Sequence, residues 1–340
     1  MNKVEAKPPF ARAIMESGGP TARAVYPYDH ALHEQQLQEF LNFTGASAFP
    51  DNEKMAYLRN LSGEVIMAAS EDVFWRYNPQ VLWPWQPVID GDWIPKPPIE
   101  SWEAAEYHKI PILTGFNTDE GTIFTPHNAK KPTDFDNFFE TLLPAFNKTD
   151  IAELNAIYPD PSKDPLSPYV DTRPGLGSQF KRLARAFGDY AYISPVRHTV
   201  HFASTFERPD DAPTFLYHFD ANQSISDGAA HGRNEPYVVR AEEKMKLGGF
   251  QAGLAIQMHA YWSSFVLCGD PNNIRKAPAD NRTPWPAYGK RGSSAKMVFG
   301  EHNDQLAGGT TQGGLTEVRA DLRFDTEGDF WWSKVMKSES

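Results

Sequence analysis

Cysteine is nearly absent from this sequence of 340 residues, which contains only Cys268. A single cysteine excludes an internal disulfide framework, and we expect Cys268 to be a small buried residue rather than a reactive thiol. No apolar run approaches the length of a membrane span. Basic residues number 33 against 44 acidic ones, a formal net charge of -11. This balance argues against nucleic acid or an anionic membrane as a partner.

A secretory leader is also missing from the first residues. Residues 1–9 include Lys3, Glu5 and Lys7 but no apolar segment, so they are not a signal peptide. Five Asn-x-Ser/Thr sequons nevertheless favour a secreted form of the protein; they lie at Asn42, Asn60, Asn147, Asn222 and Asn281. What is present is an ordinary globular composition, 40% hydrophobic and 23% charged, with enough apolar material for a sizeable core.

An acidic turn follows what reads as a buried strand. Residues 110–114 are apolar and rich in branched side chains, as in a strand covered on both faces. The Gly-bounded stretch 115–124 then carries Glu120. Loops beyond the carboxyl ends of sheet strands collect ligands and catalytic groups in open α/β folds. The alternative is that Asn117, Asp119 and Glu120 belong to a solvated turn or a weak calcium loop.

A histidine occupies the corresponding place after a second predicted strand. The apolar run 214–219 is followed by a Gly-rich loop, 227–239, that contains His231. An imidazole between small residues leaves room for a substrate and can take up and return a proton near neutral pH. A carboxylate can hold such a ring in the required tautomer. Glu120 and His231 are therefore candidates for the acid and the base of a catalytic triad.

These two motifs, together with the run Gln86–Pro95, resemble the type B carboxylesterase and lipase family of α/β-hydrolases, which includes the cholinesterases. The likeness extends from about Phe10 to about Phe299. Matching segments and residues are Phe10–Gly18, Gly232, Glu235, Pro236, Tyr237, Tyr261–Phe265, Gly269–Asn272 and Trp285–Tyr288. The resemblance implies an α/β-hydrolase fold, here the C-terminal strands of the central sheet with flanking helices. It also implies that Glu120 is the triad acid and His231 the triad histidine.

The nucleophile of that family has no counterpart in its usual motif. Family members carry the serine in a Gly-Glu-Ser-Ala-Gly elbow, and an upstream Gly-rich loop donates to the oxyanion. This sequence contains no Gly-x-Ser-x-Gly, and its nearest match, residues 15–19, has Met15 in the first position. Ser17 is therefore either a nucleophile in an altered elbow or a strand-end serine. The family register favours the second reading, in which Arg12–Gly18 lies on the strand after the elbow.

We accordingly expect an incomplete α/β-hydrolase domain. Residues 1–340 would form a single partial domain that begins downstream of the nucleophile, with residues 1–9 as a leader outside the family and residues 300–340 as a flexible C-terminal tail. Missing strands would leave an open sheet edge, so we expect the chain alone to aggregate. The family's usual cysteine pair is replaced by Ala46 and Tyr57.

Three functional hypotheses follow. The first is a piece of a serine carboxylesterase, acting on a small-molecule or lipid ester without a cofactor, and inactive by itself. The second is a non-catalytic cholinesterase-like binding protein, and the third is a short enzyme that uses Ser17. Retention of both Glu120 and His231 favours the first, because a binding role does not require that pair. The oligomeric state stays open.

Helical spacing predicts the remaining elements. We expect helices between Asp29 and Ser70, near residues 135–143, over Ile151–Tyr158, over Gln179–Phe206 with a break at Ser194-Pro195, and over Met258–Leu267 with Gly269 as its C-cap. Asp150 is expected to cap the second helix of the middle region, with Glu153 as its reciprocal partner. Lys296–Phe299 is predicted to be the last strand.

Two further groups of side chains permit a functional reading. Trp83, Trp85 and Trp93 lie in an irregular Pro-rich excursion, where they either line a substrate gorge or pack against the body. His198 and His201 are three residues apart on a predicted helix, but no third ligand accompanies them, so we expect no metal.

Overall fold

The computed structural model describes residues 8–22, 25–205, 212–274, 282–289, 294–321 and 326–338. Residues 1–7 of the expected leader and the sequon at Asn281 lie outside these ranges.

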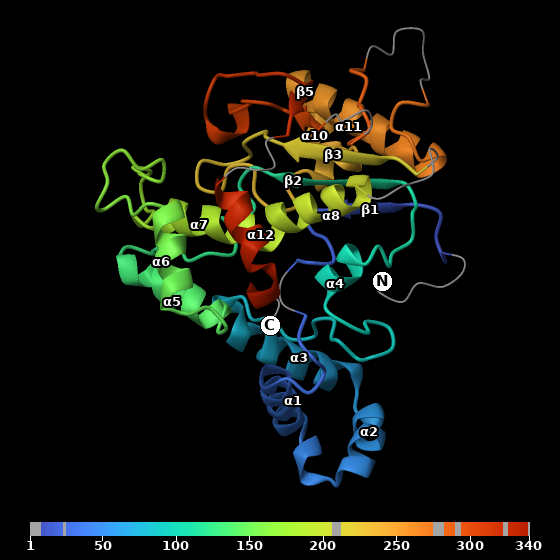
Figure 1. Ribbon diagram of the computed structural model, residues 1–340, viewed down its shortest axis with the longest axis vertical. Helices are drawn as coiled ribbons and strands as arrows, with labels where there is room; N and C mark the ends of the chain where they lie inside the picture. The colour runs from blue at the N-terminus through green and yellow to red at the C-terminus, as the bar shows by residue number, and fades with distance from the viewer. Residues whose placement is uncertain are drawn as a thin grey trace.

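The described residues form one five-stranded mixed sheet in the order of the chain (Figure 1). Its strands are β1 (Ala13–Glu16), β2 (Ile112–Asn117), β3 (Thr214–Phe219), β4 (Ala295–Phe299) and β5 (Thr316–Ala320). The first four run parallel, and β5 pairs antiparallel with β4. Because β1, β2 and β3 are parallel neighbours, their carboxyl ends meet at one edge of the sheet, which brings the acid turn and the histidine loop together.

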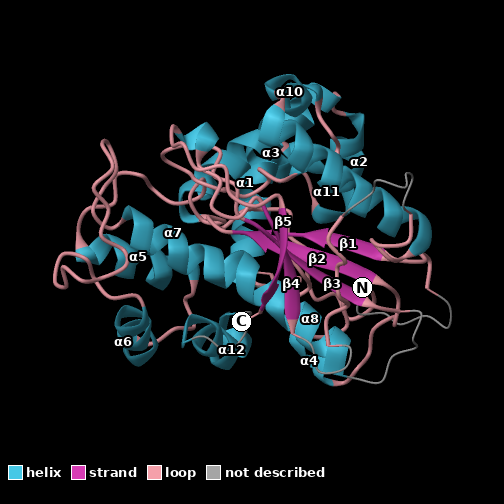
Figure 2. Ribbon diagram, turned by 90° about the horizontal axis from the view of Figure 1, so that it is seen from above, coloured by secondary structure: helices cyan, strands magenta, loops and turns pink. Residues whose placement is uncertain are grey.

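Helices cover both faces of this sheet (Figure 2), as parallel sheets require. Side chains alternate along each strand, so Phe215 and Tyr217 pack toward α11 (Gly249–Cys268). Leu216 points to the other face, where it packs with Phe116 of β2 and with Val196 of α8 (Ser194–Thr205). This layering confirms the expected α/β class.

A second apolar cluster holds the helices beyond the carboxyl edge together. It includes side chains of α5 (Pro132–Leu142), α6 (Lys148–Ile157), α7 (Phe180–Gly188) and α12 (Thr326–Ser338). Between α7 and α8 the helix does not break as predicted but widens into one π-turn, Asp189–Ile193, in which Ser194 N–H donates to the Asp189 carbonyl. Pro195 lacks an N–H, and its ring needs room against the preceding turn, which the wider turn provides.

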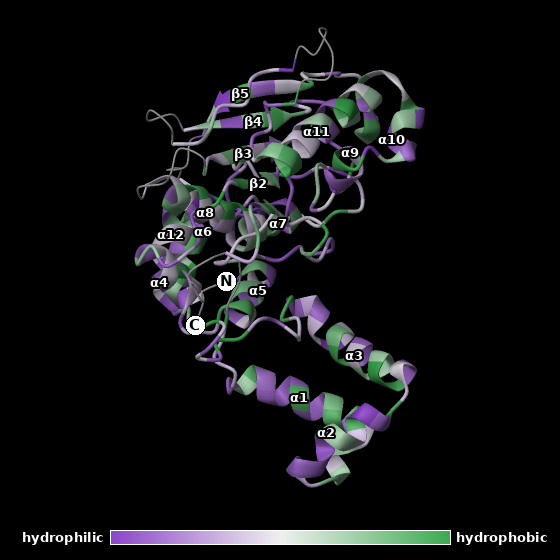
Figure 3. Cartoon of the chain, turned by 90° about the vertical axis from the view of Figure 1, so that its right-hand side faces the viewer, coloured by the Kyte–Doolittle hydropathy of each residue, from purple (hydrophilic) through white to green (hydrophobic). Residues whose placement is uncertain are grey.

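Three helices form an arm that stands apart from the sheet (Figure 3). They are α1 (Ala31–Thr44), α2 (Asp51–Asn60) and α3 (Gly63–Tyr77), and the 3-10 turn Ala46–Ala48 lies between the first two. The arm has a small buried cluster of its own around Phe40, Ala69 and Val73. After a further 3-10 turn, Asn78–Gln80, the predicted irregular excursion leads to the short α4 (Pro98–Glu103).

One of the two predicted helix caps differs from prediction. Asn147 caps α6 by accepting the N–H groups of Thr149 and Asp150, so Asp150 is the reciprocal partner and Glu153 is not. Gly269 is the left-handed C-cap of α11, as expected.

The predicted flexible tail is instead structured over its described part. It contains the 3-10 turn Gln305–Ala307, β5 and α12, because β5 completes backbone pairing with β4 and Trp331 is buried in the helical cluster. The prediction for Cys268 is wrong. It is exposed, because it ends α11 on the solvent side.

Candidate active site

Glu120 lies in a tight turn directly after β2. The strand extends through Asn117, three residues beyond the predicted end, and the Asn117 backbone N–H donates to Glu120 Oε1 at 2.6 Å. Glu120 is 1% exposed. A carboxylate held by a backbone donor inside the protein is not a decoration of a solvated turn, so the alternative reading of this motif does not describe the structure.

His231 lies in the loop after β3, within hydrogen-bond distance of that carboxylate. Glu120 Oε2 is 2.7 Å from His231 Nδ1, and the histidine side chain remains 30% exposed. The short α9 (Glu235–Val238) and α10 (Glu242–Leu247) follow the loop. A buried carboxylate beside Nδ1 favours the tautomer with the proton on Nδ1, which leaves the Nε2 lone pair available.

Backbone pairing fixes the two loops to each other. Asp119 N–H donates to the Ala229 carbonyl at 3.1 Å, and Ala229 N–H donates to Asp119 Oδ2 at 2.9 Å. Burial raises the pKa of Asp119 above its usual range, although the Ala229 N–H opposes the shift. Asp119 and Ala230 also form an isolated parallel bridge. The separation of acid and base is therefore set by main-chain pairing together with the buried Asp119 side chain.

Two aromatic rings flank the imidazole. The ring centroid of Tyr192 lies 4.4 Å and that of Phe124 5.3 Å from the centroid of His231. Tyr192 belongs to the π-turn, so the widened helix supplies one wall of the site. Trp83 packs on Phe124 at 5.4 Å, whereas Trp85 and Trp93 are largely exposed.

Amide side chains connect the site to the end of β1. Asn117 Nδ2 donates to the Ala230 carbonyl at 2.7 Å and to Asn234 Oδ1 at 3.2 Å. Asn234 Nδ2 donates to Glu16 Oε2 at 2.6 Å. Burial raises the pKa of the Glu16 carboxyl, while hydrogen bonds from Trp262 and Asn234 oppose that rise.

Ser17 follows β1 in the left-handed backbone region, with φ of 55°. Its side chain is inside the protein, with the residue 5% exposed, and its N–H continues the ladder to the Gly115 carbonyl. Within the described ranges, no hydrogen bond joins Ser17 to His231. The structure thus brings together Glu120 and His231 but does not join Ser17 to them by a hydrogen bond.

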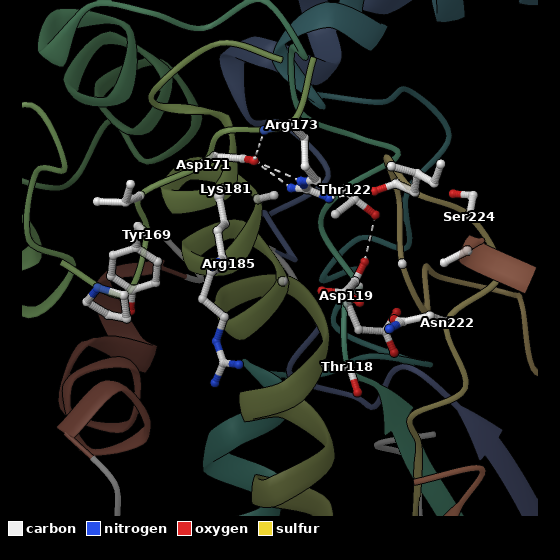
Figure 4. A pocket seen from close by; sticks show the side chains of 18 of the residues that line it. Thr118, Asp119, Thr122, Tyr169, Asp171, Arg173, Lys181, Arg185, Asn222 and Ser224 are labelled. Carbon is white, nitrogen blue, oxygen red and sulfur yellow. Dashed lines mark hydrogen bonds and ion pairs between the residues drawn. The ribbon is translucent and has the colours of Figure 1, made fainter. Parts of the chain in front are cut away.

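A polar cavity of about 800 Å³ borders the acid turn (Figure 4). Lys181 and Arg185 project from α7 on one side, and Asp119 and Asn222 lie across from them. Glu120 contributes to the lining and His231 does not. The cavity therefore adjoins the acid rather than the exposed part of the imidazole.

The sequence did not predict that Asn234, Glu16 and Tyr192 belong to the site. Asn234 and Glu16 carry no motif of their own in a single sequence, and Tyr192 is one aromatic residue among many in a helical region. The proline at position 195 was the only available signal for an irregular helix beside the site.

Neither metal ligation nor membrane insertion has support in the described ranges. No cluster of three or more His, Cys, Asp or Glu side chains is placed to hold a metal ion there. Among the helices that the structure describes, none combines the length and the apolar character needed to cross a bilayer.

Comparison with known proteins reveals extended similarity. A model of the carboxylesterase family matches residues 3–313. The chain is 31% identical over 326 residues to secreted lipase 4 of Gibberella zeae, covering 95% of this chain and 54% of that protein. It is 25% identical over 295 residues to an acetylcholinesterase of Bungarus fasciatus, covering 82% and 46% of the respective chains.

A solved structure shares the fold. Esterase EstA of Aspergillus niger matches with a TM-score of 0.73 at 21% identity, over 97% of this chain and 60% of that one. This chain spans about half the length of the curated relatives named above. The structural similarity confirms the expected fold class.

Proposed function

The chain belongs to the carboxylesterase family and has an α/β-hydrolase-like fold, and we propose that Glu120 and His231 are the acid and the base of a triad that hydrolyses carboxylic esters. The observation that carries this proposal is the 2.7 Å pairing of a buried Glu120 carboxylate with Nδ1 of a partly exposed histidine. That arrangement leaves Nε2 free for proton transfer at the protein surface.

The proposed chemistry follows from the donor and acceptor roles. Nε2 of His231 accepts the proton of a serine hydroxyl as its oxygen attacks the ester carbonyl, and the imidazolium then donates that proton to the leaving alcohol. Water, deprotonated by the same Nε2, attacks the acyl-serine, and the imidazolium returns the proton to the serine oxygen as the carboxylic acid is released. Glu120 holds the ring and stabilises its positive charge without itself taking the proton.

We further propose that these 340 residues do not complete the reaction by themselves. They contain no Gly-x-Ser-x-Gly, and the buried position of Ser17 does not favour attack on a substrate ester. Without an activated nucleophile and an oxyanion hole, water and His231 alone would give far slower hydrolysis. A non-catalytic binding protein is the competing hypothesis.

The proposed substrates are small-molecule or lipid esters of carboxylic acids. Relatives bearing the names lipase and acetylcholinesterase support this class. Secretion is proposed as well, because one relative is named a secreted lipase and the sequon residues Asn42 and Asn60 are exposed on the arm. A loss of mass after peptide N-glycosidase treatment of the native protein would support secretion, whereas an unchanged mass would speak against glycosylation.

Ester hydrolysis by the native protein from its source organism tests the proposal. We would assay p-nitrophenyl acetate, butyrate and palmitate with the native protein, with H231Q and with the surface control H302N. We expect H231Q to lose at least about 10³-fold in kcat, and H302N to retain activity because His302 is exposed and lies beside Asp220 rather than Glu120. Equal activity of H231Q and the native protein would contradict the proposal, and absence of hydrolysis with every ester would favour the binding protein.

A further inference from the structure

An unbroken set of hydrogen bonds runs from the end of β1 to the histidine loop. Glu16 Oε2 accepts from Asn234 Nδ2 at 2.6 Å, Asn234 Oδ1 accepts from Asn117 Nδ2 at 3.2 Å, and Asn117 Nδ2 also donates to the Ala230 carbonyl at 2.7 Å. Ala230 directly precedes His231. Asn117 is fully buried and Asn234 is 1% exposed, so water does not readily replace these partners.

A carboxylate at one end of this set and a backbone carbonyl at the other end, both of which only accept, fix the direction of the two amides between them. An ionised carboxylate only accepts hydrogen bonds, whereas an amide has one accepting and one donating end. Asn234 must therefore turn its Nδ2 toward Glu16, which presents its Oδ1 to Asn117. Asn117 must in turn point its Nδ2 toward Asn234 and the Ala230 carbonyl, and this is the observed orientation.

We propose that Glu16 is a positioning residue for His231, because its carboxylate holds Asn234 in the orientation that accepts from Asn117, and Asn117 in turn holds the backbone of the histidine loop. The inference rests on the proposed role of the Glu120 and His231 pair, and it assigns a specific task to a residue at the end of the neighbouring strand. Asn117 links the two parts of the site, since its backbone N–H binds Glu120 while its side chain binds Ala230.

The second hydrogen bond of Glu16 makes the inference testable. Glu16 Oε1 accepts from Trp262 Nε1 at 2.7 Å. In E16Q, the side-chain oxygen can accept from either Trp262 or Asn234, and the side-chain nitrogen then faces the donor of the other residue. If Asn234 rotates, its donor faces that of Asn117; if Asn117 also rotates, its oxygen faces the Ala230 carbonyl. Any of these arrangements leaves a mismatch in a buried set.

The double variant E16Q/N234D removes the mismatch while exchanging the positions of amide and carboxylate. The amide nitrogen at position 16 donates to the new carboxylate at position 234, whose other oxygen accepts from Asn117. All hydrogen bonds to Asn117 and Trp262 are then regained with nearly unchanged shape. Rescue by this double variant is not expected if Glu16 merely fills space.

The test is a ¹H–¹⁵N correlation spectrum of the native protein labelled with ¹⁵N-histidine, in which H231Q assigns the Nδ1 proton signal. We expect the signal to be present in the native protein, lost or broadened in E16Q, and restored in E16Q/N234D. W262F is the matched control. It removes the hydrogen bond from Trp262 Nε1 to Glu16 Oε1, which is also partly buried, but keeps the hydrogen bond from Asn234 to Glu16. It should retain the signal.

An unchanged Nδ1 signal in E16Q, or its loss in W262F together with no restoration in E16Q/N234D, would overturn the inference. If E16Q does not fold, N234D and the double variant still test the inference. N234D places two carboxylates, which both only accept, against each other at positions 16 and 234, so it should lose the Nδ1 signal, and E16Q/N234D should restore it. Absence of the signal in the native protein, with no change in E120A, would instead refute the Glu120 and His231 pair itself.

Discussion

At the scale of single residues, Gly121 determines how closely the acid turn approaches α7. A Cβ atom at this position would lie 1.9 Å from the Ala184 carbonyl oxygen. We expect G121A to destabilise the protein by about 1–3 kcal/mol or more, because helix backbone must shift, and to disturb Glu120 next to it. Urea denaturation measures the change, with G63A as the control because a Cβ at Gly63 meets open space. Equal stabilities of the two variants would contradict this packing.

His198 makes the folded state sensitive to acid. Burial, and then the nearby His201, lower the pKa of His198 from its ordinary 6.5 to about 3. Its Nδ1 lies 2.9 Å from Thr21 Oγ1, and its ring packs on Trp332. Between pH 6.5 and 3, His198 is therefore protonated in the unfolded chain but neutral in the folded chain. The free energy of unfolding falls as the pH falls, by up to about 1.4 kcal/mol per pH unit.

We predict that H198Q flattens this pH dependence. Thermal or urea unfolding measured from pH 7 to pH 4 should show a smaller loss of stability for H198Q than for the native sequence, whatever the variant costs at pH 7. H302N, at an exposed histidine, should leave the dependence unchanged. Parallel curves for H198Q and the native sequence would show that His198 does not contribute.

The sequence predicted the two titratable residues of the site because each lies in a motif after an apolar strand. It did not predict the residues that orient them. Asn117 reads as part of a turn, although it ends β2, and the link between Asn234 and Glu16 joins positions that are far apart in sequence. Contacts of that kind depend on strand order, which a single sequence does not display.

At the scale of elements, Asp150 joins α6 to the C-terminal helix. Its buried carboxylate lies 2.9 Å from Lys334 Nζ and 2.8 Å from Lys337 Nζ, and it also accepts the Asn147 N–H. Burial raises the pKa of Asp150, but the hydrogen bonds from Lys337 and Lys334 outweigh burial and leave it well below its usual range. The stabilisation is present above the unfolded pKa and is lost as the pH falls through the folded pKa.

We predict that D150N destabilises the protein by about 1.5–3 kcal/mol at pH 7, since it removes a buried partner of two charged donors. E153Q is the control, because Glu153 contacts Lys334 from a half-exposed position and should cost at most about 1 kcal/mol. The difference between the variants in urea denaturation should shrink at low pH. No difference at pH 7 would mean that α12 does not depend on this contact.

Local signals predicted some elements well and others poorly. The strand Thr214–Phe219 and the C-cap Gly269 agree with the structure because an apolar run and a left-handed glycine suffice to define them. β5 was missed because three of its five residues are polar or charged, so the strand that pairs with β4 is not an apolar run that the sequence displays. The π-turn was missed because helical spacing does not distinguish a widened turn from a regular one.

At the scale of the whole molecule, the arm exposes several large apolar side chains. Met67 and Trp75 of α3 are 61% and 64% exposed, and β1 forms one edge of the described sheet. We predict that the isolated 340-residue chain self-associates through such surfaces. Light scattering coupled to size exclusion measures this, and M67E/W75E should reduce the association. A monodisperse 38.2 kDa monomer with a sharp cooperative melt would contradict the prediction.

The layered architecture was predictable, whereas the role of the C-terminal segment was not. Buried parallel strands alternating with helices indicate an α/β sheet from sequence alone. Residues after Phe299 looked like a tail because they are rich in Gly and polar residues. Their structure depends on Trp331 entering a cluster built by α5, α6 and α7, and that destination is visible only in three dimensions.

The most direct test of the central claim is fluorophosphonate labelling of the native protein, identified with an antibody to this chain and followed by mapping of the labelled serine. We expect labelling that disappears in H231Q and a modified serine other than Ser17. Absence of labelling in the native protein would contradict the role of Glu120 and His231 as acid and base, and modification of Ser17 would contradict the proposal that these residues lack the nucleophile.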